Sequence, residues 1–249
     1  MPQPPRVQLF ITCIIDSLFP HVGEAAVKVL ERLGIAVEFP EAQTCCGQPG
    51  YNAGFRAEAR ELALNFMAVF EQSAAPIVTP SGSCAAMIVH GYPDLFAHDT
   101  ANLARAKALA ARTYEFSQFL VDVLKVEDIG ARFNGTLTYH PSCHLLRGLG
   151  VKDAPLKLLS HVRAAEVVPL PNAEECCGFG GLFAVKHGDI SGAILDRKLE
   201  NIRAAKAGTV VGCDMSCLMH IQGALSRDGS LVRCAHLAEV LAGGAMHEA

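Results

Sequence analysis

A doubled cysteine followed by glycine occurs twice in this chain, as TCCGQPG at residues 44–50 and as ECCGFGG at residues 175–181. One further cysteine stands 32 or 33 positions before each pair, and another stands 38 or 40 positions after it. Ten randomly placed cysteines would not repeat three spacings this closely, so the chain contains a duplicated unit of the form C…CCG…C. The repeated cysteines are Cys13, Cys45, Cys46 and Cys84, then Cys143, Cys176, Cys177 and Cys217.

Composition predicts a globular protein with a substantial core. Of the 249 residues, 51% are hydrophobic and 18% are charged, which excludes a disordered chain. The longest apolar stretches, such as 7–15, are much shorter than the roughly 20 residues of a membrane-spanning helix. We therefore expect no membrane span.

The many cysteines and the N-terminal sequence indicate whether the protein is expected in a reducing or an oxidising compartment. The start MPQPPR lacks the charged and then apolar order of a secretory signal, so we expect a cytoplasmic protein whose thiols stay reduced. A disulfide framework is not expected. The 21 Lys and Arg residues form no basic run, and the net charge is −4, so no nucleic-acid partner is predicted.

Hydrophobic patterns predict alternating strands and helices in both halves. In the first half, strands are expected over 7–13, 35–39 and 76–80, and helices over 20–33, 53–70 and 102–125. After a linker over 126–135, strands are expected over 136–139, 166–170, 209–212 and 231–234, and helices over 155–161, 190–205 and 236–241.

The strand, helix, strand order is that of an α/β protein with parallel sheets flanked by helices. We predict two pseudo-symmetric Rossmann-like units, a first repeat with a helical linker region over 1–130 and a second repeat over 131–249. Ligands of such sheets gather beyond the carboxyl ends of the strands, and each repeated cysteine comes after a predicted strand. The four cysteines of each half are therefore expected to converge.

Four thiolates suit either zinc or an iron–sulfur cluster. Structural zinc usually takes closely spaced CxxC pairs, whereas these ligands come from separate loops and include two adjacent residues, which suits the neighbouring irons of a cluster. We expect one iron–sulfur site per half. A redox-active dithiol at the pair is the rival interpretation, and a structural zinc protein is a further alternative.

Other residues could extend these sites. Cys213 lies four residues before Cys217 and remains an open candidate ligand, whereas Cys234 is expected to be a small core residue. His140, His144 and His220 lie near repeated cysteines and could bond a cluster sulfur or a metal, although satisfied structural histidines are commoner. No nucleotide-binding or hydrolytic motif is present.

The duplicated C…CCG…C pattern resembles the cysteine-rich CCG-domain family, whose members include the CCG-bearing subunit of heterodisulfide reductase, the glycolate oxidase iron–sulfur subunit and lactate utilization protein A. Two CCG repeats without a ferredoxin-like CxxCxxCxxxCP segment, together with YEFSQFLVDVL at 114–124, are most similar to the last of these. That resemblance implies an iron–sulfur electron-transfer subunit of an oxidoreductase complex that converts L-lactate to pyruvate, with the eight repeated cysteines as ligands of 4Fe–4S clusters. It also implies two partners, a ferredoxin-type iron–sulfur subunit and a third small subunit.

One departure separates the chain from the reductase pattern, which closes each repeat with CxxC. The corresponding positions are Ser81 and Asp214, so five cysteines per half become four. This weakens the alternative of a heterodisulfide reductase component, and the absent ferredoxin-like segment weakens that of a glycolate oxidase iron–sulfur component. Ser81 and Asp214 remain open as oxygen ligands, and no residue of the chain is predicted to act in catalysis by itself.

Overall fold

Two four-stranded parallel sheets organise the chain, which a computed structural model describes over residues 5–243. The first sheet has the order β2-β1-β3-β4 and the second the order β6-β5-β7-β8, so each strand has a counterpart in the other sheet. The strands are β1 (Arg6–Leu9), β2 (Ala36–Glu38), β3 (Ile77–Thr79), β4 (Thr113–Glu115), β5 (Arg132–His140), β6 (Arg163–Val168), β7 (Thr209–Gly212) and β8 (Arg233–His236). The predicted α/β fold of two pseudo-symmetric repeats is confirmed.

Helices connect the strands and cover the sheets. In the first repeat they are α1 (Cys13–Leu18), α2 (Pro20–Arg32), α3 (Gln48–Asn52), α4 (Arg56–Phe70), α5 (Gly82–Ala86), α6 (Tyr92–Leu95), α7 (Thr100–Ala110) and α8 (Phe116–Gln118). In the second they are α9 (Ala154–Ser160), α10 (Leu182–Lys186), α11 (Gly188–Ala205), α12 (Met215–Arg227) and α13 (Leu237–Ala242). Three π-helical turns occur in the described chain: η1 (Met87–Gly91), η2 (Phe119–Val123) and η3 (His144–Gly148).

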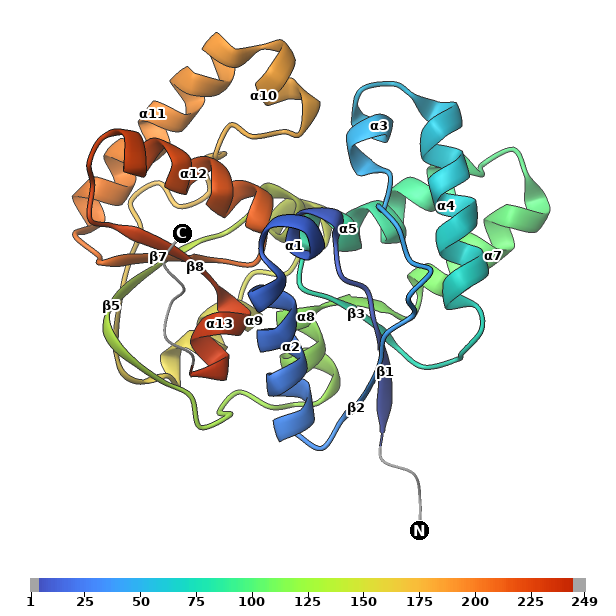
Figure 1. Cartoon of the computed structure of the whole chain (residues 1–249), viewed down its shortest axis with the longest axis horizontal. Coiled ribbons are helices and arrows are strands. Elements are labelled where there is room, and N and C mark those ends of the chain that lie inside the picture. Colours follow the sequence, from blue (N-terminus) through green and yellow to red (C-terminus); the bar gives the residue numbers. More distant parts are fainter. Residues whose placement is uncertain (1–4, 244–249) are drawn as a thin grey trace.

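The helices form a central layer and two outer layers (Figure 1). Helices α2, α8, α9 and α13 lie between the sheets, whereas α4 and α7 cover the first sheet from outside and α11 and α12 cover the second. Apolar residues of α2 recur at threes and fours and are buried in the central layer, which explains why this helix forms. Buried residues of both repeats therefore join in one large hydrophobic cluster.

The outer layer of the first sheet has its own aromatic core. Phe10, just after β1, packs edge-to-face on Phe66 and Phe70 of α4, with ring centroids 5.0 and 5.6 Å away. Tyr92 of α6 lies against Phe66 at 5.4 Å and donates a hydrogen bond of 3.0 Å to the carbonyl oxygen of Cys46. This aromatic core therefore supports the backbone of the first doubled cysteine.

The sequence prediction of a single helix over 102–125 is wrong. Helix α7 ends at Ala110, strand β4 pairs with β3 through Thr113–Glu115, and the chain then turns into α8 and η2. The β-branched and aromatic residues Thr113 and Tyr114 favour the strand, but three residues are too few to show a strand period. The linker over 126–135 is also shorter than predicted, because β5 begins at Arg132. The repeat boundary near residue 130 stays a prediction.

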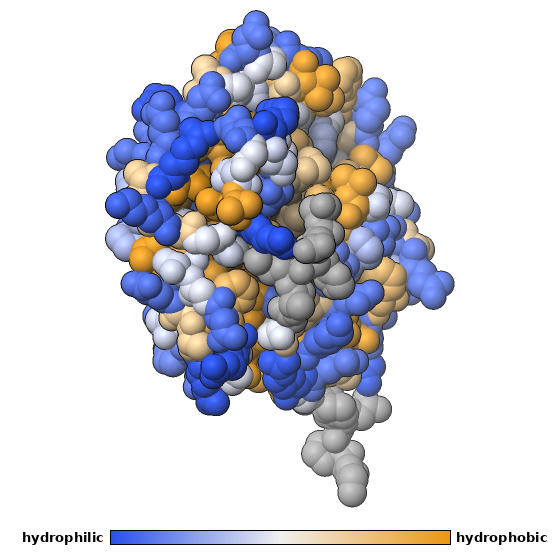
Figure 2. Space-filling model, turned by 60° about the vertical axis from the view of Figure 1, so that its left-hand side comes forward, coloured by the Kyte–Doolittle hydropathy of each residue, from blue (hydrophilic) through white to orange (hydrophobic). Residues whose placement is uncertain are grey.

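Within residues 5–243, every helix is too short or too polar to cross a bilayer. One face of the molecule is mostly hydrophilic, with hydrophobic residues emerging in separate patches (Figure 2).

Candidate metal centres

The repeated cysteines follow the carboxyl ends of the parallel strands, where the loops of both repeats meet. Cys13 begins α1 after β1, and Cys84 lies in the first turn of α5 after β3. Cys143 and Cys217 take the matching places after β5 and β7. We call the first cysteine set Cys13, Cys45, Cys46 and Cys84, and the second cysteine set Cys143, Cys176, Cys177 and Cys217.

The thiols of the first cysteine set lie close together. Cys13 Sγ is 3.6 Å from Cys45 Sγ, and Cys46 Sγ is 3.2 Å from Cys84 Sγ. The backbone N–H of Gly47 donates to Cys45 Sγ at 3.4 Å. Gly47 has a φ of 83°, a left-handed conformation that lets the chain turn sharply behind the pair.

The second cysteine set repeats this geometry. Cys177 Sγ lies 3.0 Å from Cys217 Sγ, and the N–H of Gly178 donates to Cys176 Sγ at 3.3 Å. Gly178 has a φ of 88°, and a Cβ built there would lie 2.5 Å from the carbonyl oxygen of Ser191 in α11. Glycine is therefore required at this position by both the backbone conformation and the packing.

A single cleft between the repeats is lined by both cysteine sets. Of the lining cysteines, Cys46, Cys84, Cys177 and Cys217 are buried, and Cys13 is exposed. All ten cysteines of the chain are free thiols. The buried thiols are positioned to hold a group away from water, whereas Cys13 is exposed to solvent.

The proton chemistry of the thiols fits a metal centre. The hydrogen bond with Cys45 raises the pKa of Cys13, and hydrogen bonds from Cys13 and Cys46 lower the pKa of Cys45 to about 3. The second set shows the same contrast: the hydrogen bond with Cys176 raises the pKa of Cys143, while Cys143 lowers the pKa of Cys176. Crowded thiols cannot all ionise without compensation, and a bound cation would supply it. The cysteine clusters thus suit metal or iron–sulfur binding.

Ser81 and Asp214 occupy the positions three before Cys84 and Cys217, and both cap helices. Ser81 Oγ accepts from the N–H of Cys84 at 3.3 Å. Asp214 accepts from Ser216 N at 3.3 Å in its own helix and from Ser83 N at 2.8 Å across the repeat interface. These hydrogen bonds satisfy the hydroxyl of Ser81 and the carboxylate of Asp214 without a metal.

Cys213 and Cys234 lie apart from the cleft lining. Cys213 is fully buried, burial raises its pKa, and the hydroxyl of Tyr139 lies 3.7 Å from its sulfur. Cys234 lies on β8, where burial raises its pKa to about 12. Neither thiol is placed to join the second cysteine set.

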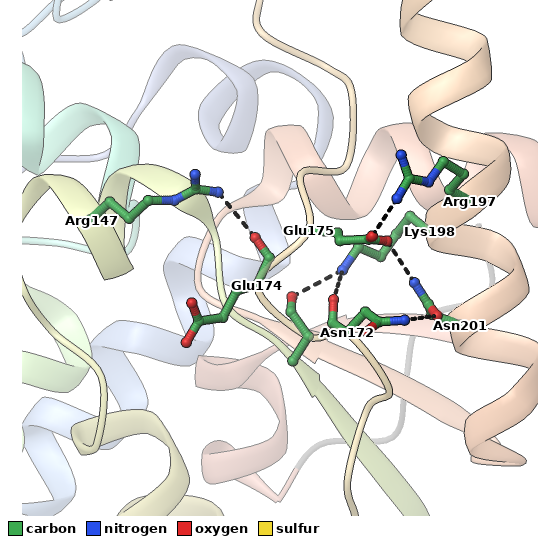
Figure 3. A network of polar contacts seen from close by, with 8 residues as sticks. Arg147, Asn172, Glu174, Glu175, Arg197, Lys198 and Asn201 are labelled. Carbon is green, nitrogen blue, oxygen red and sulfur yellow. Dashed lines mark hydrogen bonds and ion pairs between the residues drawn. The ribbon is translucent and has the colours of Figure 1, made fainter.

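A polar network positions the loop that enters the second doubled cysteine (Figure 3). Glu175 accepts from Arg197 at 2.7 Å and from Asn201 at 2.8 Å, so its carboxylate is bonded to α11. Lys198 Nζ donates to the carbonyl oxygens of Ala173 at 2.9 Å and of Asn172 at 3.5 Å. The network fixes the backbone just before Cys176.

The three histidines considered from the sequence have different surroundings. His220 has a partner, since its Nε2 lies 3.3 Å from Ser191 Oγ, and His144 Nδ1 lies 3.6 Å from Cys143 Sγ. His140 is buried, and neither of its ring nitrogens has a hydrogen-bond partner among residues 5–243. One ring nitrogen of His140 and the sulfurs of Cys177 and Cys217 all lie within 4.8 Å of one another. The unsatisfied imidazole beside the second cysteine set also fits a bound group.

The fold and the two cysteine sets define a duplicated cysteine-rich α/β protein, and the family comparison agrees. The family model of the cysteine-rich domain CCG matches residues 7–89 and 137–222. The chain is 56% identical to lactate utilization protein A of Geobacillus kaustophilus, over 95% of this chain and 98% of the relative. The corresponding protein of Anoxybacillus flavithermus is 54% identical over the same shares. The chain belongs to the lactate utilization protein A family of CCG proteins.

A solved structure supports the fold alone. A hypothetical protein from Helicobacter pylori superposes with a TM-score of 0.62 and 11% identity, and the match covers 99% of this chain and 51% of that one.

Proposed function

We propose that this protein is an iron–sulfur electron-transfer subunit of a complex that oxidises L-lactate to pyruvate. The observation that carries the proposal is the convergence of all eight repeated cysteines on one cleft. The name of the relatives, lactate utilization protein A, supports the choice of substrate.

Each cysteine set is proposed to hold one iron–sulfur cluster of the 4Fe–4S type, for which four thiolates are a complete ligand set. Such a cluster, when bound, accepts and releases single electrons. The chain contributes by bringing the thiolates together, by keeping Cys46 and Cys177 buried from water, and by leaving Cys13 exposed. Burial and hydrogen bonds to sulfur are the means by which a protein adjusts a cluster's reduction potential.

The oxidation of L-lactate to pyruvate releases two electrons and two protons. In the proposed role, the electrons leave this subunit one at a time for a second redox protein. The partners we propose are a ferredoxin-type iron–sulfur subunit and a third small subunit, in the cytoplasm. The isolated chain would then be part of an oxidoreductase rather than the whole enzyme.

Anaerobic purification followed by iron and acid-labile sulfide analysis tests the cofactor. We expect a brown protein that contains both, with an electron paramagnetic resonance signal after reduction. Stoichiometric zinc without iron or sulfide after anaerobic reconstitution would instead establish a structural zinc protein. Deletion of the gene tests the substrate, because growth on L-lactate should be lost while growth on pyruvate continues.

A disulfide reductase component is the second candidate function. The hydrogen bonds of Ser81 and Asp214 weigh against it, since these side chains cap helices at the positions where the reductase pattern has a fifth cysteine. Reduction of a heterodisulfide by the isolated protein with a viologen donor, abolished in Cys177→Ala and retained in Cys234→Ala, would favour this candidate over lactate oxidation.

A further inference from the structure

His140, in the second repeat, is a buried polar residue whose ring nitrogens are unsatisfied. It ends β5, pairs with Gly212 of β7 in the sheet register, and is 1% exposed. Neither ring nitrogen meets a hydrogen-bond partner within the described chain. Leaving a buried polar group unsatisfied destabilises the fold, so an imidazole here needs a compensating interaction. One ring nitrogen of His140 lies within 4.8 Å of the sulfurs of Cys177 and Cys217.

The first repeat shows what this position looks like without a polar group. Cys13 and Cys143 correspond in the repeats, and counting back three residues from each makes Phe10 the counterpart of His140. Phe10 is fully buried and packs on Phe66 at 5.0 Å. An apolar ring satisfies the fold at this position, so the fold alone does not require histidine.

A second pair of corresponding residues, one in α4 and one in α11, also changes from aromatic in the first repeat to polar in the second. Gly47 packs on Ala59 of α4, and Gly178 packs on Ser191 of α11, which aligns these helices and makes Lys198 the counterpart of Phe66. Lys198 is fully buried, and its charge acts on His140. The first cysteine set is therefore backed by two aromatic rings, and the second by an imidazole and an ammonium group.

The imidazole of His140 suits bonding to a metal centre, because the side chain is buried and both ring nitrogens lack a partner among residues 5–243. A neutral imidazole offers one nitrogen lone pair for a metal and one N–H for an acceptor such as sulfur.

We propose that a ring nitrogen of His140 bonds to the metal centre held by the second cysteine set, either to an iron or through its N–H to a sulfur, a contact that the first cysteine set lacks. The inference deepens the proposed function and rests on it. A histidine ligand in place of a thiolate, or an N–H donated to a cluster sulfur, raises the reduction potential of an iron–sulfur centre. The buried charge of Lys198 acts in the same direction by favouring the more negative, reduced state. The second centre therefore has the higher potential, and electrons pass from the first set to the second.

Nitrogen hyperfine spectroscopy tests the bond. The full-length protein is produced with ¹⁵N-labelled histidine, reconstituted anaerobically with iron and sulfide, and studied by pulsed electron paramagnetic resonance. We expect a ¹⁵N coupling from one of the two centres, large if nitrogen binds iron and small if its N–H bonds sulfur. The coupling should vanish in His140→Phe, which installs the residue of the first repeat, and a second one should appear in Phe10→His.

Redox titration supplies the independent measurement. His140→Phe should lower the higher of the two midpoint potentials and leave the lower one unchanged. His140→Gln, which keeps an N–H donor of similar reach, should lie between the wild type and His140→Phe. His161→Phe is the matched control, because His161 is exposed and its Nδ1 lies 2.9 Å from the carbonyl oxygen of Lys157, away from the cleft.

The outcomes separate this inference from the function on which it rests. Iron at both centres without a histidine coupling in the wild type overturns the role of His140 alone, and this measurement needs no variant to fold. A coupling that survives in His140→Phe but disappears in His144→Phe would assign the bond to His144 and also overturn the proposal. Failure to bind iron at all contradicts the proposed function itself.

Discussion

The two cysteine sets lie at matching places in sheets of the same strand order, but the repeats surround them differently. Behind the first set are Phe10 and Phe66, and behind the second are His140 and Lys198. The loop before the first pair is held by Gln43, whose side chain bonds the backbone of Ile11, whereas a network of charged and amide groups holds the second loop. The two repeats thus share the positions of the thiols but differ in the residues that surround them.

The largest expected difference follows from removing one cysteine from a single set. Cys177→Ala should abolish the second centre and leave the first, so the iron bound per chain should fall by about half. Cys46→Ala should remove the other half, with the remaining electron paramagnetic resonance signal belonging to the second set. Cys234→Ala should retain full iron content. Loss of all iron in both single variants would mean that the two sets hold one shared centre.

The glycines after the doubled cysteines should differ in their tolerance of a methyl group. A Cβ at Gly178 would lie 2.5 Å from the oxygen of Ser191, whereas one at Gly47 would lie 3.3 Å from the oxygen of Ala59. The left-handed backbone alone costs roughly 1–3 kcal/mol in either variant, and Gly178→Ala adds a steric clash. Denaturant unfolding should therefore show a greater loss of stability for Gly178→Ala than for Gly47→Ala.

Gly192, inside α11, is the matched control for these glycine variants. A methyl group on its Cα would meet no atom within 4 Å outside its own helix backbone, and helices favour alanine over glycine. Gly192→Ala should raise the free energy of unfolding by roughly 0.5–1 kcal/mol. Equal losses in Gly47→Ala and Gly178→Ala would show that packing against α11 does not constrain the second turn.

Two buried residues at corresponding places in the repeats should make the stability of the fold depend on pH in opposite directions. Glu115 caps α8 and His236 caps α13 at corresponding places, and both are fully buried. Burial raises the pKa of Glu115 from 4.5 to about 7, so its contribution to stability is complete below pH 4.5 and is lost as pH rises to 7. Burial lowers the pKa of His236 from 6.5 to about 4, so stability is lost as pH falls through that range.

Unfolding free energies measured from about pH 4 to about pH 8 test this contrast. Glu115→Gln should reduce the loss of stability between about pH 5 and 7.5, and His236→Asn should reduce the loss between about pH 6.5 and 4, each by roughly 1–3 kcal/mol. The slopes are compared rather than the absolute stabilities, because Glu115 also accepts hydrogen bonds from Ser117 and Gln118. Parallel pH profiles for both variants and the wild type would refute the opposite roles.

The smallest expected difference concerns the two helix caps at the repeat interface. Asp214→Ala removes bonds to both Ser83 and Ser216 and should lower the free energy of unfolding by about 1–3 kcal/mol. Ser81→Ala removes a cap within its own helix and should cost about 1 kcal/mol. Because Ser81 Oγ lies 3.4 Å from Asp214 Oδ2, the double variant should lose less than the sum.

An exposed aspartate provides the control for the cap variants. Asp228 is paired with Arg203 at the surface, and Asp228→Ala should change stability by less than about 1 kcal/mol. A strictly additive double variant of Ser81 and Asp214 would show that the two caps act independently across the interface.

The short strand β4 could not be predicted from the sequence pattern. Strand β4 has three residues and follows α7 closely, so its pattern merged with that helix in the prediction over 102–125. What defines β4 is its pairing with β3, which lies more than 30 residues earlier in the chain. Strand β7, the second half of β5 and the helices α2 and α11 could be predicted because each carries its own apolar run or helical period.

The sequence by itself determined the duplication, the α/β order and the eight cysteines that follow strand ends, because these depend on spacing and local pattern. Only the tertiary structure decided which polar groups near the cysteines have partners. His140 and His220 are equally plausible candidates in the sequence, yet Ser191 satisfies one and no described residue satisfies the other. Burial and hydrogen bonding depend on segments far apart in the chain, so the contrast between Phe10 with Phe66 and His140 with Lys198 exists only once α4 and α11 pack on their sheets.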